Sequence, residues 1–249
     1  MNIHLTINLE PAAEVTLPIH YNHIAQAAIY NSIEPELSAA LHNQGYLDGG
    51  RTFRLFAFSR LIGAYIMDKE RKMFRFTGGL KMVICSPLHE FCQSLANTLL
   101  TRGWVQMGHA TIPVNKVSIQ TYQVKKETIA VRTLSPLVLY STLLRPNGRK
   151  YTCYFQPGDP DYNGLLSGNL RKKYRALYGS EEPAGEVRAL ALGQPRLHVV
   201  KYKSTVIKGY SGRMQLSGPI PLLQLGVDAG FGGKNAQGFG CVEPAGSDR

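Results

Sequence analysis

The residues with the clearest chemical potential lie near the end of the chain, where five glycines fall within residues 230–240 around a single lysine, Lys234. Glycine carries no Cβ, so glycines this dense mark a backbone that turns sharply or lies directly against another group. Successive N–H groups in such a turn can hold an anion, and a lysine at its edge adds positive charge. The segment predicts a phosphate-binding nest or, alternatively, a plain glycine-rich turn before a last strand.

Two nucleotide-binding loops are excluded by the spacing of these glycines. A P-loop needs a glycine five residues before its Gly-Lys pair and Ser or Thr after it, but Asp228 and Asn235 occupy these positions. The Rossmann pattern fails because its final glycine would be Asn235. The nest therefore does not belong to a mononucleotide or dinucleotide fold.

Positive charge is concentrated in the second half of the chain. Residues 1–117 carry 10 Lys and Arg against 8 Asp and Glu, whereas residues 118–249 carry 18 against 9. An excess of this size favours a polyanionic partner held in a salt-sensitive way, although it could also be incidental. In this half, residues 171–175 surround a tyrosine with four cations, and Lys201 and Lys203 flank another. Cations interleaved with aromatic rings suit RNA, but a solvated helix face can have the same composition.

The sequence predicts a soluble, cytoplasmic protein, and no metal or cofactor is expected. The four cysteines show neither CxxC nor Cys/His spacing, so no zinc site or disulfide framework is indicated. The first residues alternate in polarity, unlike a signal peptide, and no apolar run approaches the roughly 18 residues of a membrane helix.

The first half contains the elements of one β-α-β-β-α-β unit. Residues 2–9 alternate strictly and predict a half-buried strand. Helices are expected over 22–44 and 88–102, each closed by a glycine. The remaining strands are expected at 53–58, at 80–84, from 104 onward and at 114–122.

The second half repeats this order with an insertion near its start. Its expected elements are a strand at 127–133, an apolar run at 135–140 leading to a hairpin turn at 146–148, a helix at 160–177, paired strands at 196–204 and 206–216, a helix at 219–227 and a last strand at 237–243. The order is that of the ferredoxin-like unit, whose open sheet is also the RRM scaffold. We therefore predict an α+β fold of tandem ferredoxin-like domains, 1–123 and 124–249, the second basic and carrying the glycine-rich loop 230–240. Neither half has the RNP1 aromatic signature, so stacking of RNA on the sheet as in an RRM is not expected.

Several motifs resemble the CRISPR-associated endoribonucleases that process CRISPR precursor RNA, the Cas-six family. Residues 208–219, Lys-Gly-Tyr-Ser-Gly-Arg-Met-Gln-Leu-Ser-Gly-Pro, a short apolar helix and then the glycine-rich residues 229–240 resemble its C-terminal signature. Residues 29–30, 41–42 and 53–59 resemble its N-terminal block, and 131–136 its central one. The resemblance spans nearly the whole chain, and the glycine-rich end is its most specific part.

The resemblance implies tandem ferredoxin-like domains that grip repeat RNA along a basic face and in the cleft between them. It also implies metal-independent cleavage, in which the ribose 2′-OH attacks the adjacent phosphate in line and leaves 2′,3′-cyclic phosphate and 5′-OH ends. Such a reaction needs a base near the 2′-OH, an acid near the leaving oxygen and a cation for the charge that builds on the phosphorane.

His42 matches the family's catalytic histidine, at the end of the first helix and just before Gly45. Imidazole suits acid or base catalysis because its unperturbed pKa lies near neutral pH. Without the resemblance, a histidine at a helix C-terminus is better explained as a surface residue favoured by the helix dipole. His23 and His20, which precede the same helix, are the reserve candidates.

Tyr30 matches the family's helix tyrosine but lies twelve residues before His42. That separation is roughly 18 Å along a continuous helix, at ~1.5 Å per residue. Both side chains can reach one phosphate only if the helix breaks, and Pro35 predicts such a break. Tyr46, four residues after His42, is the competing tyrosine.

The cation of the expected site departs from the family's pattern. Family members often place a lysine a few residues after the histidine, but residues 43–50 of this chain read Asn-Gln-Gly-Tyr-Leu-Asp-Gly-Gly. We therefore expect Arg51, or in reserve Arg54, to supply the charge, unless it comes from elsewhere.

The partner implied by the resemblance is the CRISPR repeat RNA of a precursor transcript. The expected RNA contacts are Lys172, Lys173, Arg175, Lys201, Lys203, Arg213, Gly232, Gly233, Lys234 and Gly238. The partners left open are other subunits of a CRISPR effector complex and a second copy of the chain. The alternative function is that of a non-catalytic repeat-RNA-binding subunit of such a complex.

Overall fold

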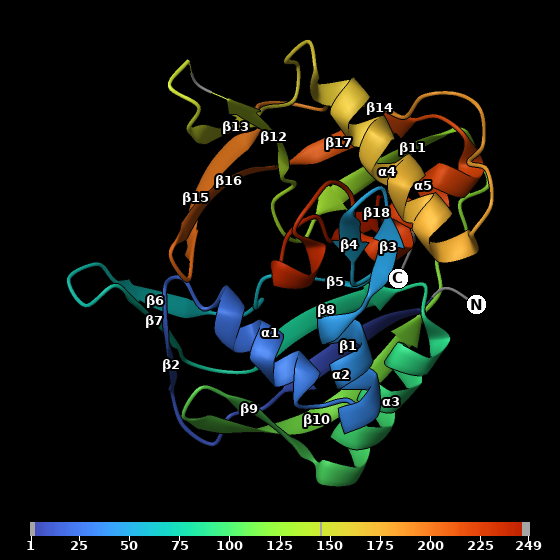
Figure 1. Cartoon of the computed structure of the whole chain (residues 1–249). Helices are drawn as coiled ribbons and strands as arrows, with labels where there is room; N and C mark the ends of the chain where they lie inside the picture. The colour runs from blue at the N-terminus through green and yellow to red at the C-terminus, as the bar shows by residue number, and fades with distance from the viewer. Residues whose placement is uncertain (1–2, 145, 246–249) are drawn as a thin grey trace.

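The computed structural model describes residues 3–144 and 146–245, and its first half is built on a five-stranded antiparallel sheet (Figure 1). In spatial order the strands are β5 (Ala57–Phe58), β8 (Leu80–Ser86), β1 (Ile3–Leu9), β10 (Ala110–Gln120) and β9 (Trp104–Met107). The helices of this half are α1 (Asn22–Tyr30), α2 (Pro35–Asn43) and α3 (His89–Arg102).

The strand expected at residues 2–9 is present as β1, but it is covered on both faces. Its apolar residues are buried as the alternation predicts, and His4 and Thr6 on the opposite face are buried as well. The second half of the chain closes over that opposite face: Cys85 of β8 lies with its sulfur 4.0 Å from the sulfur of Cys241.

The helix expected over 22–44 is two helices, because Pro35 begins a new one. Pro35 cannot donate an N–H to the preceding turn and disfavours helical geometry in the residue before it. Glu34 accordingly has an extended ψ of 138°, and α2 starts with the proline in its first turn. The chain therefore turns between Tyr30 and His42, as the sequence predicts.

Short strands in the first half were not predicted. β2 (Val15–Pro18), β7 (Met73–Phe76) and β6 (Tyr65–Asp68) form a small separate sheet. The single strand expected at 53–58 is also wrong. Two strands are present, because the positive φ of Leu55 (52°) separates β4 (Arg51–Phe53) from β5. β4 instead forms a hairpin with β3 (Tyr46–Asp48).

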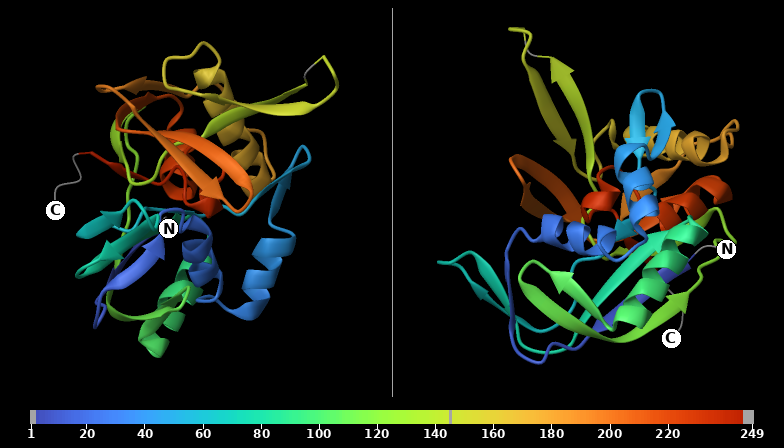
Figure 2. Two further views of the ribbon diagram at one scale, coloured as in Figure 1. Left: turned by 90° about the vertical axis from the view of Figure 1, so that its left-hand side faces the viewer. Right: turned by 60° about the horizontal axis from the view of Figure 1, so that its bottom comes forward.

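The second half is a four-stranded antiparallel sheet with two helices, and the two halves together form a tandem ferredoxin-like fold (Figures 1 and 2). In spatial order the strands are β14 (Arg188–Ala191), β17 (Arg213–Ser217), β11 (Thr128–Thr133) and β18 (Val242–Pro244). The helices are α4 (Tyr162–Tyr178) and α5 (Ile220–Ala229). Each half buries a hydrophobic cluster of its own, and the boundary at residue 123 stays a prediction.

Two ribbons leave this second sheet. β12 (Leu139–Leu144) and β13 (Lys150–Phe155) form the hairpin expected around residues 146–148. The pair expected at 196–204 and 206–216 is only partly correct: β15 (Arg196–Tyr202) and β16 (Thr205–Ser211) pair as a separate ribbon, while β17 continues into the sheet beside the unpredicted β14. The last strand is shorter than expected: a 3-10 turn, η1 (Asn235–Gln237), takes residue 237, and β18 begins only at Val242.

None of the helices within residues 3–144 and 146–245 is long and apolar enough to cross a membrane.

Candidate active site

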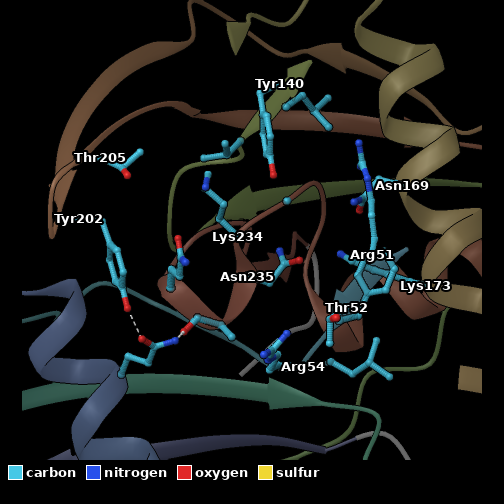
Figure 3. Close-up of a pocket in the computed structure, with 18 of the residues that line it drawn as sticks. Arg51, Thr52, Arg54, Tyr140, Asn169, Lys173, Tyr202, Thr205, Lys234 and Asn235 are labelled. Atoms are coloured by element: carbon cyan, nitrogen blue, oxygen red, sulfur yellow. Dashed lines mark hydrogen bonds between the residues drawn. The ribbon is translucent and has the colours of Figure 1, made fainter. Parts of the chain in front are cut away.

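A cavity of about 690 Å³ lies between the two halves, and eight of the 17 expected site residues line it (Figure 3). The first half contributes Tyr30, His42, Arg51 and Arg54. The second half contributes Tyr140, Lys173, Tyr202, Lys203 and Lys234. Side chains suited to proton transfer therefore face side chains suited to binding phosphate across one space.

His42 is exposed at the C-terminal end of α2. Its Nδ1 lies 3.0 Å from Asn43 Oδ1. With that amide oxygen as acceptor, Nδ1 carries the proton and Nε2 keeps a lone pair that can accept one. The imidazole is thus held on one side and available on the other.

Tyr30 contacts His42 because the chain reverses between α1 and α2. The two rings are edge to face, with centroids 5.8 Å apart, and Tyr30 also packs on Phe56 at 5.6 Å. Burial raises the pKa of the Tyr30 phenol, and the neighbouring Arg54 guanidinium partly opposes that rise. The hydroxyl is therefore protonated at neutral pH and can donate a hydrogen bond or a proton.

Arg54 is the arginine that the structure ties to this pair, since its Nη2 donates to the backbone carbonyl of His42. Arg51, our first expectation for the cation, also lines the cavity, from an exposed position on β4. Tyr46, the competing tyrosine, packs instead against the cluster of Leu55, Leu225 and Ala229.

The reserve histidines lie at the start of α1. His20 Nδ1 accepts the backbone N–H of Lys201 at 3.3 Å, and burial, with Lys201 and Lys72 nearby, lowers its pKa. His23 is exposed, with its ring edge to face with Tyr202 at 6.5 Å. Both reserve histidines thus contact the β15–β16 ribbon, and neither lines this cavity.

Lys173 differs from the surface RNA contact that we predicted. It is 1% exposed, and its Nζ donates to the carbonyls of Gly230 at 2.6 Å and Gly232 at 2.9 Å. Burial lowers its pKa from the usual 10.5 to about 7. Its immediate role is to fasten the glycine-rich loop to α4.

The glycine-rich loop is also more internally bonded than a free anion nest. The N–H groups of Gly233, Gly238 and Gly240 all donate to protein carbonyls, those of Val138, Asn235 and Pro136. Gly238 has a φ of 85°, and a Cβ there would lie 2.7 Å from Asn22 Nδ2. Gly232, with a φ of 71°, would place a Cβ 2.6 Å from the carbonyl of Val138. Gly238 is therefore required for packing between the halves, and Gly232 for packing of the loop against residue 138 within the second half.

Lys234 is the part of this loop that faces the cavity. Its backbone is left-handed, with a φ of 61°, and its ammonium lies 5.0 Å from the centre of the Tyr140 ring. Partial burial lowers its pKa. A lysine held over a ring at the wall of a cavity can bind a phosphate with little loss of side-chain freedom.

Of the five remaining expected RNA contacts, only Lys203 lines this cavity. Arg175 is engaged by Asp48 at 2.9 Å and Glu182 at 2.8 Å, so it ties the β3–β4 hairpin to α4. Lys203 lies at the β15–β16 turn with a φ of 53° and lines the cavity. Lys201 and Arg213 are exposed on strands, and Lys172 is half-buried on α4.

Among residues 3–144 and 146–245, no group of three or more His, Cys, Asp or Glu side chains could hold a metal ion.

Sequence models of one protein family match nearly the whole chain. The model described as "CRISPR-associated protein Cas6, N-terminal" matches residues 16–118, and "CRISPR associated protein Cas6, C-terminal" matches residues 118–244. The chain belongs to the Cas6 family.

Curated relatives in the Cas6 family cover the chain almost end to end. The CRISPR-associated endoribonuclease Cas6 1 of Methanocaldococcus jannaschii is 26% identical over 97% of this chain and 92% of its own length. The CRISPR-associated endoribonuclease Cas6 of Pyrococcus furiosus is 24% identical over 93% of this chain and 84% of its own length.

Solved structures agree with the fold of this Cas6-family chain. A structure titled "Characterization of a Cas6-related gene from Pyrococcus furiosus" has a TM-score of 0.85 at 19% identity and covers both chains fully. One titled "CRISPR associated protein Cas6" has a TM-score of 0.79 at 24% identity and covers 98% of this chain and 100% of its own.

Two cavity residues of this Cas6-family chain were missed from the sequence. Gln26 donates to the carbonyl of Ala236 at 2.6 Å and accepts the hydroxyl of Tyr202. Tyr140 lies under Lys234. Neither has a signal in the sequence, because the role of Gln26 arises from the docking of the two halves and that of Tyr140 from the packing of the glycine-rich loop against β12.

Proposed function

We propose that this chain is a metal-independent endoribonuclease that cleaves CRISPR precursor RNA within the repeat. The observation that carries the proposal is the meeting of His42, Tyr30 and Arg54 at a cavity whose opposite wall carries Lys203 and Lys234. The names of the curated relatives, both CRISPR-associated endoribonucleases, support the same substrate class.

The proposed reaction is an in-line attack of the ribose 2′-OH on the adjacent phosphate. His42 takes the 2′-OH proton at Nε2 while the O2′–P bond forms, and Tyr30 gives its proton to the 5′-oxygen as the P–O5′ bond breaks. The products carry a 2′,3′-cyclic phosphate and a 5′-OH. Tyr30 suits the acid role because burial keeps its phenol protonated.

Arg54 is proposed to stabilise the charge that builds on the phosphorane. Its hydrogen bond to the His42 carbonyl fixes the guanidinium beside the base, so little reorganisation is needed as the charge develops. Arg51 and the lysines across the cavity are proposed to bind the neighbouring phosphates.

Cleavage in the presence of EDTA, followed by analysis of the product ends, tests this proposal. The substrate is a transcript of a CRISPR repeat from the source genome. We expect cutting at one position, with a 5′ product whose end resists ligation until the cyclic phosphate is removed. Cleavage that requires Mg²⁺, or that leaves a 3′-OH, would contradict the mechanism.

The departure from the family's lysine after the histidine favours a second candidate, a non-catalytic repeat-RNA-binding subunit. That candidate predicts tight, repeat-selective binding without any cut under all metal and pH conditions. Comparable affinity for repeat RNA, heparin and duplex DNA would instead indicate a merely basic surface.

A further inference from the structure

A second cavity, of about 1040 Å³, lies on the other side of Tyr30 and His42. Its walls come from α1, the turn between α1 and α2, α2 itself, the end of α3 and the β15–β16 turn. The β15–β16 ribbon approaches α1 from above (Figure 1), and the hydroxyl of Tyr202 on that ribbon donates to Gln26 of α1.

The two cavities meet at the candidate active site. Five residues line both of them: Gln26, Tyr30, His42, Tyr202 and Lys203. A chain that lies in both cavities must therefore pass between the His42–Tyr30 pair and the lysine at the β15–β16 turn. The second cavity is at the upper end of the roughly 300–1,000 Å³ of small-molecule sites, so it has room for more than one base.

The lining of the second cavity suits a polyanion. Arg102 is held at its edge, since Nη1 donates to the carbonyl of Asn31 at 3.0 Å and the guanidinium lies 5.2 Å from the Trp104 ring. Lys203 is a second cation, whereas Glu34 is the one carboxylate in the described lining. The other side chains facing this space are mostly small or polar, including those of Ser38, Asn43 and Thr98.

We infer that this second cavity is a groove for the RNA strand on one side of the scissile phosphate, while the first cavity takes the other side. The inference rests on the proposed RNA substrate and adds a binding site whose lining comes mainly from the first half of the chain, with Arg102 as a phosphate contact that the sequence did not predict. Arg102 and Lys203 bind phosphates of the strand, and the junction between the cavities holds the phosphate that His42 and Tyr30 attack.

A single charge placed in the groove tests this assignment. Ala27 is an exposed residue of α1 that lines the groove only, and both Glu and Gln are good helix formers. Ala27→Glu and Ala27→Gln have nearly the same shape and differ by one negative charge. We expect the Glu variant to bind repeat RNA about fivefold more weakly than the Gln variant at low salt, with the gap closing at high salt.

Binding is measured by fluorescence anisotropy in a His42→Ala background, so that the RNA stays intact. Repeats shortened from either end separate groove contact from long-range repulsion: the gap between Glu and Gln should vanish for one truncation and remain for the other. An equal affinity of the two variants, or a gap that survives both truncations, overturns the groove. If the Glu variant binds repeat RNA more weakly than the Gln variant but the native protein cleaves no RNA, the groove stands and the proposed nuclease is overturned instead.

Discussion

Lys173 gives a prediction whose size follows from its burial. The ammonium is enclosed beneath the glycine-rich loop, and its pKa falls from 10.5 to about 7. The unfolded chain therefore binds more protons than the folded one between these pH values, so the contribution of Lys173 to stability rises with pH in this window. Below pH 7 both states are protonated and the dependence disappears.

The perturbation is Lys173→Met, which removes the titrating group and leaves the carbonyls of Gly230 and Gly232 without their donor. Integrating the proton-binding difference from pH 7 to pH 9 gives about 2 kcal/mol, so the destabilisation caused by Lys173→Met should grow by about 2 kcal/mol over that range. Taking the difference between the two proteins cancels the titration of other groups.

Urea unfolding of both proteins at several pH values measures this difference. Lys172→Met is the matched control, because Lys172 is the neighbour of Lys173 on α4 and is only half-buried. The destabilisation caused by Lys172→Met should not grow between pH 7 and pH 9. A destabilisation by Lys173→Met that is constant from pH 7 to 9, or that shrinks, would refute a buried lysine with a lowered pKa.

Three further outcomes follow from the site and the loop. Gly238→Ala should destabilise the fold by about 2 kcal/mol or more in thermal or urea unfolding, because of its positive φ and the close packing at its Cβ position, whereas Gly164→Ala in the open face of α4 should stabilise it by ~0.5–1 kcal/mol. Arg54→Ala should slow single-turnover cleavage of repeat RNA on the order of 100-fold and Arg51→Ala much less; equal losses would contradict the assignment of the cation. Tyr30→Phe, which keeps the ring packing, should slow cleavage at least about tenfold with RNA affinity unchanged, and an unaffected rate would remove Tyr30 from the acid role.

The long elements of the fold could be predicted because their patterns are local. The alternation in β1 and the proline that starts α2 act within a few residues. The short strands could not be predicted in this way. β14 reads Arg-Ala-Leu-Ala, which has little intrinsic strand preference, and it becomes a strand because β17 pairs with it.

The residues of the candidate site divide in the same way, into those that the sequence indicated and those whose roles depend on tertiary packing. Resemblance indicated His42 and Tyr30, and the break at Pro35 explained how they could meet. The burial of Lys173 could have been predicted from helical spacing, although the lysine stands in a run of basic residues that suggests an exposed position. Leu166, Leu170 and Lys173 lie on one face of α4, and all three are buried. No sequence pattern indicates which of Arg51 and Arg54 lies beside His42, since this depends on where the β3–β4 hairpin folds back.

The most direct test of the central claim is the single-turnover rate of repeat-RNA cleavage in EDTA by the native protein, by His42→Ala and by His109→Ala. His109 is an exposed histidine that lines neither cavity, so it controls for the loss of an imidazole. We expect His42→Ala to slow cleavage by about 10²–10⁴-fold while still binding the RNA, and His109→Ala to cut at the native rate. A His42→Ala protein that cleaves as fast as the His109→Ala control would contradict the account.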